Sequence, residues 1–230
     1  MKIDNGMMKQ LAKLGVLLML GASMGACASL GGTSWGEEVQ LHDGSKIIVA
    51  RSASRGGRHE IGQKPPFEWQ KLKFTMPVTG ERVTWEDNYS EDIGTASFLP
   101  MLLDVQQGIA YLVADPMGCL SYNKWGRPNP PYVVFKYEGK EWKRIPLQEL
   151  PAGIKTPNLI FSEPDATAES IRERPVSAKA IQEIIAGYRQ PEYKTILREA
   201  LPESQLCPDW NSQRYRSPKA PLPMKPATEK

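Results

Sequence analysis

The chain is 230 residues long and carries 29 lysine and arginine against 26 aspartate and glutamate side chains, a formal charge of +3. A balance this close to neutrality offers no extended positive field, so we expect no nucleic-acid partner. The length and the 40% hydrophobic content suit one domain, with or without an appendage, that has a real hydrophobic core.

The beginning of the chain has the order of an export signal. Three lysines, at positions 2, 9 and 13, precede an apolar run over residues 14–20, which leads to small residues and a cysteine. The run is too short to cross a bilayer as a helix, which takes about 20 apolar residues. The pattern predicts a signal peptide over residues 1–26. Its removal would leave 26 basic and 25 acidic side chains.

The sequence Met24-Gly25-Ala26-Cys27 resembles the lipobox of bacterial lipoproteins, and the chain as a whole resembles uncharacterised proteobacterial envelope lipoproteins. The resemblance implies that Cys27 is acylated, with palmitate among its chains, and anchors the mature protein. Ala28, where an aspartate would retain such a protein, resembles the signal for the outer membrane, facing the periplasm. Residues 27–36 are predicted to form a tether. An ordinary cleaved signal peptide is the alternative.

Residues 37–150 alternate apolar and polar side chains between short turn sequences. Four β-hairpins are predicted, because a turn glycine separates two alternating runs in each case: Gly44, Gly80, Gly108 and Gly139. The predicted fold is mainly β, an α+β arrangement with two C-terminal helices. A sandwich, a meander and a small propeller-like body all agree with these hairpins.

Residues 151–211 are predicted to form a helical appendage packed on the β body. Ser177 is a suitable N-cap for a helix with an apolar stripe through Ile181 and Ile185. A second helix is predicted to begin at Pro191 and to end before Pro202. Residues 158–161 are a candidate strand. Residues 212–230 are rich in proline, hold five basic residues against one acidic residue, and are predicted to be a disordered tail.

Two cysteines remain besides Cys27. An exported chain lies where disulfides form and persist, so Cys119 and Cys207 are predicted to pair. Two buried free thiols are the alternative.

The loop that follows Cys119 is the leading candidate binding surface. It combines aromatic rings, amides, cations and prolines, which suit stacking on sugar rings or docking of a protein partner. The candidate residues are Tyr122, Asn123, Trp125, Arg127 and Tyr132. The alternative is that Tyr122 and Trp125 cover the core while the prolines shape a crossover.

A second candidate site centres on Arg58 and His59, between glycines that let the backbone bend tightly. Such a loop could hold an anion, or His59 could act as a general base beside an acidic neighbour. The acidic candidates lie in one segment: Glu86, Asp87 and Asp92. His42, in the first hairpin turn, is predicted to be solvated. No metal site and no cofactor are predicted, because neither the histidines nor the cysteines have ligand spacing.

Together these patterns predict a membrane-anchored envelope lipoprotein. Its expected role is to bind or scaffold a protein or cell-wall glycan partner through the loop of residues 122–132, more as a binding module than as an enzyme. A periplasmic hydrolase that uses His59 with acidic loop residues is the alternative.

Overall fold

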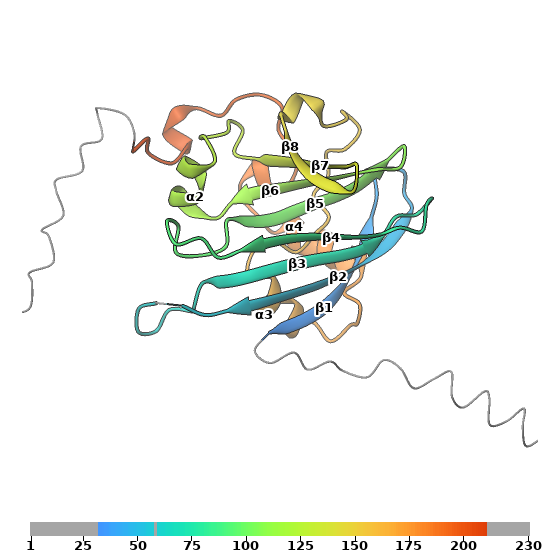
Figure 1. The fold of residues 1–230 in the computed structure, drawn as a ribbon, viewed down its shortest axis with the longest axis horizontal. Helices are drawn as coiled ribbons and strands as arrows, with labels where there is room; N and C mark the ends of the chain where they lie inside the picture. The colour runs from blue at the N-terminus through green and yellow to red at the C-terminus, as the bar shows by residue number, and fades with distance from the viewer. Residues whose placement is uncertain (1–31, 58, 211–230) are drawn as a thin grey trace, which may run out of the picture. The chain divides into compact units, whose positions relative to one another are not determined.

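Two antiparallel sheets of four strands each form the β part of the protein (Figure 1). The structure, a computed structural model, describes residues 32–57 and 59–210. The predicted fold class is confirmed: the protein is mainly β, its helices lie toward the C-terminal side, and the arrangement is that of an α+β sandwich.

Each sheet is a meander in which strands pair in chain order. The first sheet contains β1 (Thr33–Gln40), β2 (Lys46–Arg55), β3 (Phe67–Thr75) and β4 (Arg82–Asn88). The second contains β5 (Phe98–Gln106), β6 (Ile109–Pro116), β7 (Val133–Glu138) and β8 (Glu141–Ile145).

All four predicted hairpins are present, with their turns at the predicted glycines. In the second sheet the turns contain two residues each, Gln107–Gly108 and Gly139–Lys140, and all four residues have positive φ. Two successive residues of this kind make a type I′ turn, whose twist matches that of paired strands. Glycine adopts this conformation without steric cost, so the turn sequences fix the register of both hairpins.

The main core lies between the two sheets, where alternate residues of each strand point inward. Its members come from both sheets and include Val49, Leu72, Phe74, Trp85, Phe98, Leu103, Leu112 and Phe135. The rings of Trp85, Phe98 and Phe135 lie with centroids 5.2 to 6.3 Å apart. This aromatic cluster joins β4 of one sheet to β5 and β7 of the other.

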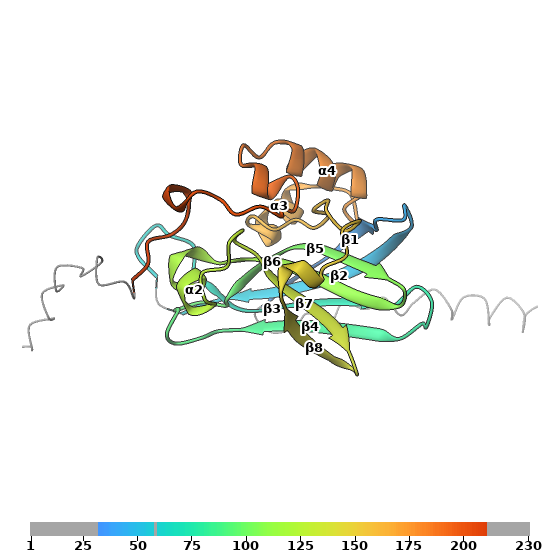
Figure 2. The same ribbon diagram turned by 90° about the horizontal axis from the view of Figure 1, so that it is seen from above.

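Residues 147–197 form a third layer (Figure 2). Its segments outside the two α-helices cover the outer face of the second sheet, and the two α-helices pack against β1 and its neighbours in the first sheet. The layer contains η1 (Leu147–Glu149), α3 (Pro164–Ser170), α4 (Ala178–Ala186) and η2 (Pro191–Tyr193). Its backbone also covers the edge of β1, since Val176 exchanges two hydrogen bonds of 2.8 and 2.9 Å with Glu38 and Gly36. None of the helices in the described ranges is long and apolar enough to cross a bilayer.

A buried ion pair connects the first sheet to this third layer. Glu37 accepts hydrogen bonds from Arg51 (3.0 Å), from the Trp35 indole (2.7 Å) and from the Ile160 amide (3.0 Å). Both charged side chains are essentially excluded from solvent. Removing one partner would leave the other charge buried and uncompensated, so the pair holds the two layers in one arrangement.

The third layer differs from the sequence expectation in two places. The helix predicted from Pro191 is only the single turn of η2, because the following amides bond to other segments: Ile196 donates to the Lys155 carbonyl at 2.8 Å. Residues 158–161 form no strand. Leu159 and Ile160 are buried there, while Asn158 bonds to the backbone of Leu103 at 2.8 and 2.9 Å.

The predicted tether, residues 27–36, overlaps the first strand. β1 begins at Thr33, so residues 33–36 of the predicted tether belong to the first sheet, with Trp35 buried in the protein. The pairing of Thr33 with Ala53 explains the difference, because β2 is long enough to extend the ladder over these residues. Cys27 and the other residues of the signal region, as well as the tail predicted for residues 212–230, lie outside the described residues.

Candidate functional site

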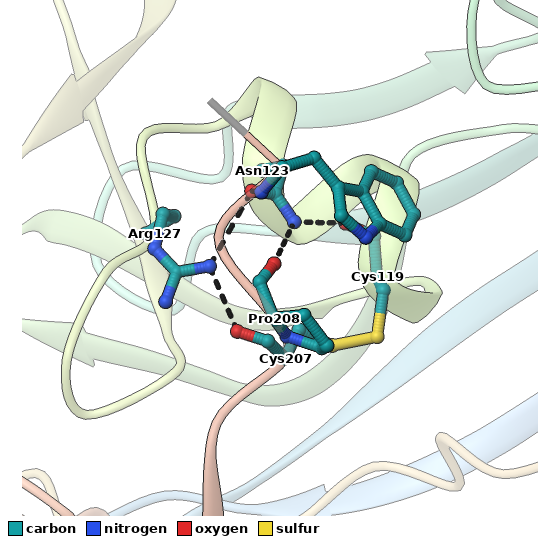
Figure 3. Close-up of a disulfide and its surroundings, with 6 residues drawn as sticks. Cys119, Asn123, Arg127, Cys207 and Pro208 are labelled. Atoms are coloured by element: carbon teal, nitrogen blue, oxygen red, sulfur yellow. Dashed lines mark hydrogen bonds between the residues drawn. A yellow bond between two sulfur atoms is a disulfide. The ribbon is translucent and has the colours of Figure 1, made fainter. Parts of the chain in front are cut away.

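The predicted binding loop, residues 119–132, is fastened to the C-terminal part of the chain. It begins in α2 (Gly118–Lys124), and the disulfide between Cys119 and Cys207 has Cα atoms 5.4 Å apart (Figure 3). The predicted pairing is therefore present. We call residues 203–210, which contain η3 (Glu203–Gln205), the C-terminal strap.

Polar side chains of the loop hold the strap beside the disulfide. Asn123 Nδ2 donates to the carbonyls of Cys119 (2.9 Å) and Pro208 (3.0 Å), and Arg127 Nη1 donates to the carbonyl of Cys207 (2.8 Å). Figure 3 shows both side chains directed at the strap. The amide and the guanidinium that suggested ligand recognition thus bind the protein's own backbone.

The aromatic residues of the loop pack into the protein. Tyr122 and Tyr132 are 4% and 3% exposed, and the Trp125 ring lies 4.6 Å from that of Phe98 at the edge of the main core. The Tyr132 hydroxyl donates to the Glu192 carbonyl at 2.8 Å, and burial raises the pKa of this tyrosine. Tyr122 and Tyr132 offer no open face for stacking, and Trp125 is partly buried, with the Arg144 guanidinium 5.6 Å from its ring centroid. The loop therefore covers the core and braces the strap.

His59 lies in the other candidate segment, the loop of residues 56–66 between β2 and β3. It is exposed, and its Nδ1 is 3.0 Å from the carbonyl of Gly57. Glu60 accepts a hydrogen bond from Gln63 in the same loop. Arg58, the other candidate of this segment, lies outside the described residues.

The loop of residues 56–66 forms one wall of a cleft of about 650 Å³. Its lining combines a polar rim with an apolar floor: Arg55, His59, Lys64 and Glu163 at the rim, and Pro66, Phe67, Leu99 and Met117 below. Arg55 lies over the Phe67 ring at 3.8 Å and is bound by Asp165 at 2.6 Å, while Lys64 pairs with Glu163 at 2.9 Å. We call this the basal cleft.

The acidic residues predicted as partners for His59 are engaged elsewhere. Asp87 is buried and accepts the amides of Ser97 and Phe98, both at 2.8 Å, and burial raises its pKa. Glu86 pairs with Lys71 at 3.0 Å, and Asp92 pairs with Lys124 at 2.8 Å. Within the described ranges no carboxylate hydrogen-bonds to His59.

A histidine–carboxylate pair does form, at the other histidine. His42 Nδ1 lies 2.5 Å from Asp104 Oδ1, and Asp104 also accepts the backbone amides of His42 (2.9 Å) and Val105 (2.7 Å). Asp104 is 3% exposed, and burial raises its pKa although the bonds from His42 act in the opposite direction. His42 is an exposed residue of the predicted turn, but its side chain is 22% exposed and binds Asp104, a partner that the sequence did not indicate.

This pair lines a second, smaller cleft of about 360 Å³, together with Gln40, Lys155, Thr156 and Gln182. Because Nδ1 faces Asp104, Nε2 is the nitrogen left to act on a bound group, which is the geometry of an oriented general base. The sequence gives only a weak signal for this pair. Asp104 is the one carboxylate in a mostly apolar strand, and nothing in the sequence shows that it meets His42, 62 residues earlier.

The described residues contain no group of three histidine, cysteine, aspartate or glutamate side chains placed to hold a metal ion. Comparisons of the chain with known protein families, with curated proteins and with solved structures found no match.

Proposed function

We propose that this protein is an envelope lipoprotein, anchored through an acylated Cys27 at the outer membrane and facing the periplasm, and that it acts as a non-enzymatic binding module. The observation that carries the binding role is the basal cleft, the largest of the clefts described above. Its walls come from the loop of residues 56–66, from Gly94 and Thr95, and from Ser162 and Glu163.

The lining of the basal cleft favours a protein segment over a cell-wall glycan. Glycan sites present open aromatic faces, whereas the aromatic ring here, Phe67, is 3% exposed and lies under the Arg55 guanidinium. An apolar floor with a rim of paired charges suits a peptide that contributes an apolar side chain and its own backbone polar groups. The proposed partner is therefore a segment of another envelope protein.

The anchor is tested with the full-length chain expressed in a bacterium with two membranes. We expect the wild-type protein to fractionate with membranes and to carry acyl chains detectable by mass spectrometry, and Cys27→Ser to carry none. An acylated Cys27→Ser protein, or a wild-type protein without lipid, would refute the lipoprotein assignment.

The cleft is tested by reversing one rim charge against a matched control. Lys64 and Lys46 are similarly exposed and each pairs with one glutamate, at 2.9 and 2.7 Å, but Lys46 lies in β2 away from the cleft. With crosslinking in intact cells, we expect Lys64→Glu to lose the crosslinked envelope protein and Lys46→Glu to keep it. Equal crosslinking by both variants would exclude the basal cleft as the binding site.

A hydrolase remains the second candidate, and the specific observation that favours it is the pair of His42 and Asp104. In this version His42, held by Asp104, is the general base, and His59 is not involved. Among envelope substrates, an activity lost in His42→Gln and kept in His59→Gln would support it. An activity that survives His42→Gln would eliminate it.

A further inference from the structure

Exposed large apolar side chains gather at one end of the two sheets. Six such side chains occur in residues 32–57 and 59–210, and four of them belong to segments at the end where β3 and β5 begin: Ile61, Tyr89, Leu120 and Trp210. Ile61 is fully exposed, and the other three are 41 to 49% exposed. Figure 1 shows α2, the end of β4 and the loop before β3 at this end, opposite the hairpin turns.

Contacts between neighbouring segments join the four positions into one surface. A Cβ atom added at Gly57 would lie 3.8 Å from the Tyr89 ring, which places the loop of residues 56–66 beside the end of β4. Lys124 of α2 donates to Ser90 (2.6 Å) and Asp92 (2.8 Å), and Asn123 of α2 accepts the Trp210 amide at 3.4 Å. We call this the basal surface; the basal cleft opens within it.

Both ends of the described chain lead to the basal surface. Thr33 pairs with Ala53, two residues before β2 ends and leads into the loop of residues 56–66. Cys27 precedes Thr33 by six residues, which span at most about 20 Å when fully extended. At the other end, Trp210 is followed by the segment of residues 212–230, which has five basic residues against one acidic residue.

We propose that the basal surface lies against a phospholipid bilayer and sets the orientation of the protein on the membrane. The inference rests on the proposed acylation of Cys27. Tyrosine and tryptophan favour the headgroup layer, isoleucine and leucine enter its apolar boundary, and basic residues are drawn to anionic lipids. The short tether supplies a high effective concentration, so a contact too weak to recruit a free protein holds the tethered one in place.

This orientation narrows the proposed partner. The basal cleft then opens beside the headgroup layer, so a protein segment that reaches it must itself lie at the membrane surface.

The hairpin turn that contains Val78 lies at the opposite end of the sheets from the basal surface. β3 has nine residues and rises about 3.3 Å per residue, so about 25 Å separates this turn from the basal surface.

The test uses the acylated full-length protein reconstituted into vesicles of phosphatidylethanolamine and phosphatidylglycerol. Ile61→Cys and Val78→Cys each introduce one thiol for an environment-sensitive fluorophore, since Cys119 and Cys207 are bonded to each other. The two native side chains are 107% and 85% exposed, which makes Val78→Cys a matched control. Tyr89→Cys gives a second probe on the basal surface.

We expect the probes at positions 61 and 89 to shift their emission to shorter wavelength and to be quenched by lipids with brominated chains, and the probe at position 78 to do neither. Probes at 61 and 78 that respond alike would overturn the inference. So would a shift at position 61 that persists without vesicles, because a second copy of the chain would then cover the surface. Acylation is measured first by mass, so an unlipidated Cys27 refutes the proposed function, whereas an acylated protein with a solvated position 61 refutes only the orientation.

Discussion

The loop of residues 119–132 is turned into the protein, whereas the loop of residues 56–66 stands out from it. Both combine a cation with residues typical of binding sites, and both were candidates on that ground. The first is tied to a distant segment by the disulfide, and Arg127 and Asn123 bond to the strap. In the second, His59 and Glu60 bond within their own loop, and Ile61 is fully exposed. Composition favoured the first loop. The two loops differ in how they are attached, since the first is held by a disulfide and buried rings, whereas the second makes an exposed ion pair between Lys64 and Glu163.

The largest effect on stability is expected when the inward loop, residues 119–132, is released from the strap. We expect Cys119→Ser/Cys207→Ser to lower the free energy of unfolding by about 4 kcal/mol, because the bond joins residues 88 apart and restricts the unfolded chain. Urea denaturation followed by tryptophan fluorescence measures the change, and Cys27→Ser serves as the control that keeps the bond. A loss below about 1 kcal/mol would mean that native hydrogen bonds alone hold the strap.

Truncating one side chain in each loop sharpens the difference. Trp125→Ala removes a ring packed against Phe98 and the main core, so we expect a loss of about 3 kcal/mol. Ile61→Ala removes a fully exposed side chain and should change the free energy of unfolding by less than about 0.5 kcal/mol. Similar losses for the two variants, in the same denaturation assay, would contradict the inward and outward assignments.

A partly buried titratable group, Asp115, lies just before the inward loop of residues 119–132. Asp115, next to the last residue of β6, lies near Glu192, Tyr132 and Tyr193. Burial, followed by the charge of Glu192, raises its pKa to about 7 from 3.8. The folded protein then holds a proton that the unfolded chain releases between about pH 4 and 7, so this group lowers stability as the pH rises through that window.

Asp115→Asn should therefore be more stable than the wild type at pH 8, by about 2 kcal/mol after allowance for partial exposure, and equal to it near pH 4. Thermal unfolding at the two pH values checks this. Asp92→Asn is the outward control: its pairing with Lys124 lowers the pKa of the carboxyl, so the change at neutral pH should have the opposite sign. An Asp115→Asn protein whose advantage is the same at both pH values would rule out the titration.

Local chemistry in the sequence was sufficient for the hairpins and for the disulfide. Gly108 and Gly139 mark two-residue turns that allow few alternatives, and the prediction that Cys27 is acylated left only Cys119 and Cys207 to pair. It was not sufficient where partners are distant. Asp104 meets His42 across 62 residues, and the Ile196 amide donates to Lys155 instead of continuing a helix. An apolar stripe at helical spacing predicts that those side chains are buried. It does not predict which carbonyl each backbone amide binds, because that depends on tertiary packing.

The smallest expected difference in the free energy of unfolding is between alanine variants of the two histidines. His59 bonds only to the carbonyl of Gly57 among the described contacts, so His59→Ala should change the free energy of unfolding by less than about 0.5 kcal/mol. His42→Ala removes a ring partner from a buried carboxylate and should lower stability by about 1 to 2 kcal/mol, a loss limited by the two backbone amides that Asp104 keeps. Urea denaturation of both variants at pH 7 makes the comparison. Equal effects would mean that the bond between His42 and Asp104 adds nothing to folding, and its geometry would then have to be explained by the second cleft that it lines.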